Sequence, residues 1–119
     1  MANIMVLDDV ADAGALIKRI LERKGYTVAS FTGEEQALAY AAAKHPDLAI
    51  LDIKLKKMTG VAVLTELKKI DAGIKVIMLT GYPTLETARE SMRLGADDYC
   101  VKPIDKDELE TKVAQTLAK

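Results

Sequence analysis

The stretch LAILD, residues 48–52, is a short apolar run that ends abruptly in a carboxylate. The run is too short for a helix and does not alternate with polar residues, which is typical of a strand covered on both faces of a parallel sheet. Three further runs resemble it: Ile4–Leu7, Val76–Leu79 and the weaker Tyr99–Val101. These runs predict buried parallel strands, each followed by polar residues.

The segments between these runs predict one edge strand and a series of helices. Thr27–Phe31 alternates in polarity, which favours a strand at the edge of the sheet. Apolar residues at helical spacing, followed by glycine or a similar stop signal, indicate the helices. The expected helices are a segment with the apolar stripe Leu16, Ile17, Ile20 and Leu21 that stops before Gly25, then Glu34–Lys44, Val61–Ile70, Leu85–Leu94, and Lys106–Ala118 capped by Asp105.

This alternation of strand and helix predicts the fold class. Because crossovers between parallel strands are right-handed, short connections require helices on both faces of one sheet. We therefore predict an α/β fold: a three-layer (βα)5 sandwich with a doubly wound, five-stranded parallel sheet. The 119 residues, half of them apolar, are enough for one compact domain over residues 1–119.

The composition excludes several classes of protein. Seventeen basic against 18 acidic side chains leave a formal charge of −1, which provides no footprint for nucleic acid or an anionic membrane. A single cysteine, Cys100, cannot form an intramolecular disulfide and is expected to be a small core residue. No signal-peptide pattern and no apolar run near the ~20 residues of a spanning helix is present. We expect a soluble, cytoplasmic protein with no direct nucleic-acid or membrane binding.

Polar residues at the strand ends predict a shared site. The first predicted strand is followed by Asp8 and Asp9, while Asp52, Thr80 and Lys102 stand at the ends of the third, fourth and fifth predicted strands. Ligands of open α/β sheets bind beyond the carboxyl ends of the strands. If the first and third strands are neighbours, three carboxylates converge, which is costly unless a cation relieves their repulsion. Few, water-accessible oxygen ligands suit Mg²⁺.

A lysine and a hydroxyl beside these acids indicate phosphoryl transfer. Such catalysis consists mostly of positioning and charge neutralisation, and a carboxylate can be the nucleophile that forms an acyl phosphate. Each residue also has an ordinary interpretation. Asp8 and Asp9 could form a turn and helix cap, Thr80 could be an ordinary strand-end residue, and Lys102 an ordinary surface charge. Their occurrence together at four strand ends favours the shared site.

Five short motifs resemble the receiver domain of two-component response regulators, and the resemblance extends over the whole chain. The motifs are MVLDD at 5–9, LAILD at 48–52, MLTG at 78–81, GADDY at 95–99 and CVKP at 100–103. The resemblance implies the strand order 2-1-3-4-5, which the alternation of strand and helix does not by itself determine.

The resemblance also implies roles for the acids. Asp52 is expected to be the phosphoacceptor. Asp9 is expected to ligate Mg²⁺ directly, and Asp8 to help through water. Asp52 and the backbone carbonyl of Lys54 are expected to be the remaining ligands that the protein provides to Mg²⁺.

Further roles implied by the resemblance concern the switch. Thr80 is expected to hydrogen-bond the phosphoryl oxygens and Lys102 to pair with them, while Tyr99 turns inward as Thr80 moves. The Lys102–Pro103 peptide bond is expected to be cis, which proline tolerates at a cost of about 0.5–1 kcal/mol.

The function implied is that of a switched signalling domain, not a conventional enzyme. It catalyses its own phosphorylation, by a histidine kinase, a phosphotransfer protein or a small phosphodonor, and its own slow dephosphorylation. Expected partners include a downstream protein or output domain that contacts the last strand with helices 85–94 and 106–118, and a second copy in a phosphorylation-dependent dimer.

Three alternatives have specific requirements. A flavodoxin-like module needs a hydroxyl- and glycine-rich loop after the first strand, where this chain has Asp8-Asp9-Val10-Ala11. An aspartyl phosphatase needs a second acid two residues after the first, where this chain has Val10. An inert receiver-like interaction module is expected when the acceptor or the acid pair is missing, and both are present.

Overall fold

Five strands and five helices alternate along the chain in the computed structural model, which describes residues 2–53, 59–81 and 85–119. The strands are β1 (Asn3–Leu7), β2 (Thr27–Phe31), β3 (Leu48–Asp52), β4 (Lys75–Thr80) and β5 (Asp98–Val101). The helices are α1 (Ala11–Glu22), α2 (Glu34–Lys44), α3 (Gly60–Ile70), α4 (Leu85–Arg93) and α5 (Lys106–Leu117).

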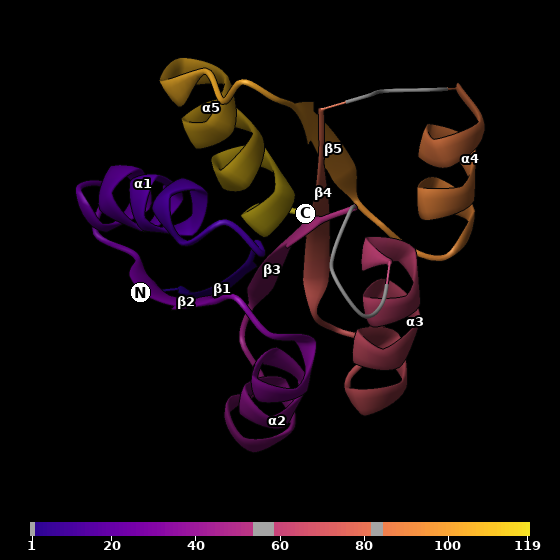
Figure 1. Cartoon of the computed structure of the whole chain (residues 1–119). Coiled ribbons are helices and arrows are strands. Elements are labelled where there is room, and N and C mark those ends of the chain that lie inside the picture. The colour runs from indigo at the N-terminus through magenta and orange to yellow at the C-terminus, as the bar shows by residue number, and fades with distance from the viewer. Residues whose placement is uncertain (1, 54–58, 82–84) are drawn as a thin grey trace.

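All strand pairs are parallel, and the order across the sheet is β2-β1-β3-β4-β5. Helices α1 and α5 cover one face of this sheet, whereas α2, α3 and α4 lie on the other (Figure 1). The predicted three-layer (βα)5 sandwich and its strand order are therefore confirmed, as is the edge position of Thr27–Phe31.

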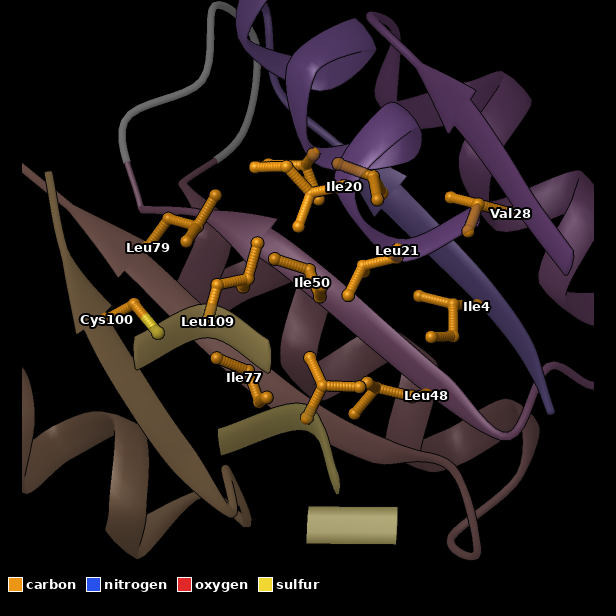
Figure 2. Packing of buried hydrophobic residues seen from close by; sticks show 13 residues of the cluster. Ile4, Ile20, Leu21, Val28, Leu48, Ile50, Ile77, Leu79, Cys100 and Leu109 are labelled. Carbon is orange, nitrogen blue, oxygen red and sulfur yellow. The ribbon is translucent and has the colours of Figure 1, made fainter. Parts of the chain in front are cut away.

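Each central strand supplies side chains to two separate cores, because successive residues of a strand point to opposite faces. In β3, Leu48 and Ile50 pack with the residues of α1 and α5, as Figure 2 shows. The intervening Ala49 and Leu51 pack in the second core, under α2 and α3. Burial on both faces explains why these strands read as unbroken apolar runs.

Local signals end and begin the helices where the sequence predicts them. The chain turns after α1 at Gly25, whose φ of 95° favours glycine. The Asp105 carboxylate caps α5 by accepting the backbone N–H of Glu108 at 3.0 Å. Thr59 caps α3 in the same way, accepting the N–H of Ala62 at 3.1 Å.

One predicted core residue is exposed. Leu16 was expected in the apolar stripe of α1, but it is 45% exposed, and the buried face consists of Gly14, Ile17, Ile20 and Leu21. Leu16 lies about 100° around the helix from Ile17, on the flank of that face. The other differences from the predicted boundaries are shifts of a residue or two at element ends.

Two further properties follow from the packing. Cys100 is buried in the core under α5, and burial raises the pKa of its thiol to about 11, as suits a small core residue. Among the described residues, no helix has the length and apolar character needed to span a bilayer.

Candidate functional site

The carboxyl ends of four parallel strands meet at one edge of the sheet. Asp52 and Thr80 are the last residues of β3 and β4, while Asp8 and Lys102 directly follow β1 and β5. The strand order places β1, β3, β4 and β5 side by side, so these polar residues form a row across the sheet.

Three carboxylates cluster at the β1 and β3 end of this row. One oxygen from each of Asp8, Asp9 and Asp52 lies within 4.8 Å of the other two. Asp8 is fully buried and Asp52 is only 6% exposed. Like charges this close and this poorly hydrated are costly unless a cation balances them.

Lys102 supplies one such cation. Its Nζ donates hydrogen bonds to Asp8 Oδ2 and to Asp52 Oδ2, both at 2.9 Å. Partial burial favours the neutral amine, but the hydrogen bonds and charges of Asp52 and Asp8 outweigh this effect and raise the pKa of Lys102. The lysine therefore stays charged at neutral pH and bridges the two buried acids.

The backbone around Lys102 holds its side chain in place. The N–H of Lys102 donates to the Thr80 carbonyl at 2.7 Å, which extends the β4–β5 ladder by one bond. The Lys102–Pro103 peptide bond is cis. The Lys102 side chain thus extends from a backbone position that is hydrogen-bonded to Thr80 of the neighbouring strand.

Asp8 has both of the roles that the sequence left open. Its Oδ1 accepts the backbone N–H of Val10 at 2.9 Å, forming a turn just before α1. Its other oxygen, Oδ2, bonds Lys102. The turn orients the carboxylate. Asp8 can therefore form the turn before α1 and belong to the shared site at the same time.

A cavity of about 330 Å³ opens in front of these groups. Its lining residues come from the ends of β1, β3, β4 and β5 and from the first turn of α4: Asp9, Asp52, Ile53, Thr80, Gly81, Thr87 and Lys102. The cavity is large enough for a tetrahedral anion. It is lined both by Asp52, the candidate nucleophile, and by the positively charged Lys102.

Besides Ile53 and Gly81 of the cavity lining, Thr87 and Gly60 were not predicted as site residues from the sequence. Thr87 of α4 lines the cavity. Gly60, the first residue of α3, packs so closely on β3 that an added Cβ would lie 2.2 Å from the Asp52 carbonyl oxygen. A glycine at a helix start, directly after the capping Thr59, is the only local signal of this close approach.

Two further residues were predicted to belong to the site, Tyr99 and Lys54. Tyr99 is half-buried on β5 and packs against the core under α3, outside the cavity lining. Lys54, predicted to supply a carbonyl ligand, lies outside the described residues. The oxygen donors of Asp8, Asp9 and Asp52 are nevertheless chemically suited to a hard cation such as Mg²⁺.

Comparison with known proteins identifies the family. The model of the response regulator receiver domain matches residues 4–114. The chain belongs to this family. Receiver domains in general bind Mg²⁺ and interact with histidine kinases and output domains, and the acid cluster of this receiver could hold such an ion.

Individual relatives agree with this assignment. The receiver is 34% identical over 115 residues to sporulation initiation phosphotransferase F of Bacillus subtilis, covering 97% of this chain and 93% of that protein. It is 34% identical over 116 residues to the transcriptional regulatory protein ZraR of Escherichia coli K12, covering 98% of this chain but 26% of that protein. The chain thus spans about a quarter of the length of ZraR.

The solved structures agree with the fold in detail. The CheY-like response regulator receiver domain protein of Methanospirillum hungatei superposes with a TM-score of 0.94 at 35% identity, covering 99% of this chain and 94% of that one. NtrX of Brucella abortus superposes with a TM-score of 0.93 at 34% identity, covering 98% of this chain and 27% of that one. A receiver of this fold therefore occurs both nearly alone and as part of longer chains.

Proposed function

We propose that Asp52 is the phosphoacceptor of this receiver, with residues 1–119 acting as one switched domain. The observation that carries the proposal is the Lys102 ammonium, which bridges Asp8 and Asp52 at 2.9 Å beside the acid cluster. This arrangement gives Asp52 a neighbouring cation and places it on the wall of the cavity. Among the three clustered acids, it is the one that ends the central strand β3.

The proposed reaction is transfer of a phosphoryl group to the Asp52 carboxylate. A carboxylate oxygen forms a bond to phosphorus as the P–N bond of a phosphohistidine, or the P–O bond of a small phosphodonor, breaks. The donor protein is a histidine kinase or a phosphotransfer protein. The product is an acyl phosphate, which the domain hydrolyses slowly.

The other residues neutralise and position the developing charge. Asp8 and Asp9, with Asp52 and the Lys54 carbonyl, would hold Mg²⁺, which when bound supplies positive charge to the phosphoryl oxygens. Lys102 contributes the ammonium. Thr80 offers a hydroxyl at the cavity wall for a phosphoryl oxygen.

The signal would leave the site through β4 and β5. Because Lys102 N–H bonds the Thr80 carbonyl, movement of Thr80 would be transmitted to β5 and to Tyr99 within it. The proposed output surface is the α4-β5-α5 face, which would contact a downstream protein, an output domain or a second copy in a phosphorylation-dependent dimer. A local anionic group that biases a two-state element is a common basis for such switches.

Intact mass after incubation with acetyl phosphate and Mg²⁺ tests the proposal. We expect one added phosphoryl group, labile to base and hydroxylamine, and none on Asp52→Asn. The matched control is Asp47→Asn, an exposed acid at the opposite end of β3, which should be labelled like wild type. Equal labelling of Asp52→Asn and wild type would refute the assignment.

The alternative of an inert interaction module is disfavoured. That interpretation requires loss of the acceptor or of the acid pair, whereas here Asp8, Asp9 and Asp52 are present and clustered. The same labelling experiment separates the two, since an inert module would gain no mass.

A further inference from the structure

Lys112, on α5, contacts Tyr99 in two ways. Its Nζ donates a hydrogen bond to the Tyr99 backbone carbonyl. The same ammonium lies over the Tyr99 ring, 5.4 Å from the ring centroid, which is within the range of cation–π attraction. One side chain therefore holds both the backbone and the ring of Tyr99.

The position of β5 at the edge of the sheet makes this contact possible. Among the described strands, β5 pairs only with β4, so one side of it has no neighbouring strand in this part of the chain. Tyr99 packs against the core under α3, whereas α5 covers the opposite face. The side chain of Lys112 therefore reaches Tyr99 around the edge of β5.

Neighbouring acids hold the ammonium in this position. Lys112 Nζ lies 3.5 Å from Glu108 Oε1, one turn earlier on α5, and 3.8 Å from Asp98 Oδ1 on β5. The same Asp98 oxygen accepts the backbone N–H of Tyr99 at 2.8 Å. Both backbone groups of Tyr99 are thus bonded by side chains that are themselves an ion pair, and the Lys112 side chain is only 26% exposed.

Tyr99 is also close along the chain to the phosphoacceptor site. Three residues beyond it, Lys102 bonds Thr80 through its backbone and Asp8 and Asp52 through its ammonium. β5 is therefore held at one end by the site and at Tyr99 by α5. An inward turn of the Tyr99 ring would separate it from the Lys112 ammonium and give up the cation–π contact.

We propose that Lys112 is a positioning residue of the switch: it restrains the inward turn of Tyr99 and so sets how readily the domain adopts its phosphorylated conformation. This inference rests on the proposed function, in which Thr80 and Tyr99 move together. The positive charge of Lys112, which interacts with Tyr99, Asp98 and Glu108, is the property that restrains the Tyr99 ring. Removing the positive charge at position 112 therefore makes the phosphorylated conformation easier to adopt, while the residues around Asp52 are unchanged.

The test is the Lys112→Met variant, which keeps the length of the side chain and removes the charge. Methionine is also a good helix former, so α5 is preserved. Without phosphodonor, the Tyr99 ring signals in the NMR spectrum of tyrosine-labelled protein should move toward their position in the beryllofluoride complex. Phosphorylation by acetyl phosphate should become about threefold faster, the factor expected for loss of one partly exposed cation–π contact.

Matched variants separate positioning from a general effect of charge. Lys112→Arg keeps the cation and should resemble wild type. Lys106→Met removes an exposed lysine of the same helix that pairs with Asp107 and Glu110, and it should leave the Tyr99 signals unchanged. If Lys112→Met does not fold, Lys112→Gln provides the same neutralisation with a polar side chain.

The possible outcomes are distinct. If wild-type Tyr99 responds to beryllofluoride but Lys112→Met and Lys112→Gln give wild-type signals and rates, then Lys112 is not a positioning residue. If wild-type Tyr99 does not respond although Asp52 is phosphorylated, the proposed coupling of Tyr99 to the site is wrong and this inference fails with it. A shift in Lys106→Met equal to that in Lys112→Met would also overturn it.

Discussion

At the scale of single residues, the negative charges that suit the acid cluster to a metal ion should also lower the stability of the metal-free domain. Asp8 and Asp52 share the ammonium of Lys102, and Asp9 adds a third carboxylate within 4.8 Å of both. A metal-binding site needs this density of charge, but a metal-free domain must tolerate the repulsion. The cluster is therefore where substitutions should raise stability while reducing activity.

Asp9→Asn should increase the free energy of unfolding in EDTA by about 1 kcal/mol, because the Lys102 ammonium offsets most of the few kcal/mol by which carboxylates at this separation repel near a protein surface. The substitution preserves size and removes one negative charge. Denaturant unfolding of both proteins in EDTA measures the difference. As a control, Asp12→Asn removes an exposed acid of the first turn of α1 and should be neutral or slightly destabilising. A less stable Asp9→Asn would mean that Asp9 serves as a structural cap.

Thr116→Val should stabilise the domain by about 1 kcal/mol, the lower end of the cost of a buried, unsatisfied hydroxyl. Thr116 is 1% exposed, and its hydroxyl has no hydrogen-bond partner within the described ranges of the chain. Valine has the same shape without the polar group. Thermal or denaturant unfolding measures the gain, and the exposed Thr111→Val on the same helix should show almost none. A loss of stability would indicate that the hydroxyl is bonded in solution.

At the scale of elements, α3 packs directly on β3, the strand that carries the proposed phosphoacceptor Asp52. Its first residue, Gly60, donates its N–H to the Ile53 carbonyl at 2.8 Å and lies against the backbone of Asp52. The helix can approach this closely because Gly60 has no Cβ. The position of α3 and the position of Asp52 are therefore coupled through backbone contact.

Gly60→Ala should separate α3 from β3, because the new Cβ would lie 2.2 Å from the Asp52 carbonyl oxygen. We expect a loss of about 1–3 kcal/mol in stability, as for other overpacked sites, together with slower labelling of Asp52 by acetyl phosphate. Unfolding and intact-mass kinetics measure the two effects. Gly81→Ala is the matched stability control, since a Cβ there meets no atom within 4 Å apart from its chain neighbours, among the residues that the structure describes. Equal stability of Gly60→Ala and wild type would contradict the close approach.

At the scale of the whole molecule, metal binding and folding should be linked. A ligand that binds only the folded state stabilises it by mass action, by about 2.7 kcal/mol when its concentration is 100 times the dissociation constant. The acid cluster is assembled from β1 and β3, so it exists only when the sheet is formed. Unfolding the domain therefore disperses the proposed metal ligands.

Wild type should gain stability steadily as Mg²⁺ rises from EDTA conditions into the millimolar range, and Asp9→Asn should gain much less. Chemical denaturation across a Mg²⁺ series at constant ionic strength measures this, with Na⁺ added to compensate for charge screening. The Asp12→Asn protein should follow wild type. If Asp9→Asn gains as much as wild type, the proposed metal site is misplaced.

The sequence by itself determined the strands, the helices and the row of strand-end residues. These features are local, because a residue run buried on both faces of a sheet must be apolar along its whole length, as in β3. Residues that end neighbouring parallel strands are brought to the same edge of the sheet. The strand order came from the family resemblance, since alternation of strand and helix alone is compatible with other orders.

Only the tertiary structure decided which of these side chains touch and how closely the layers approach. Lys102 bonds Asp8 across 94 residues of sequence, Thr87 lines the cavity from α4, and Lys112 reaches Tyr99 around the edge of β5. Such contacts depend on the angles and distances at which helices pack on the sheet. Those angles are set by the volumes of all the side chains between the layers, so no local stretch of sequence encodes them.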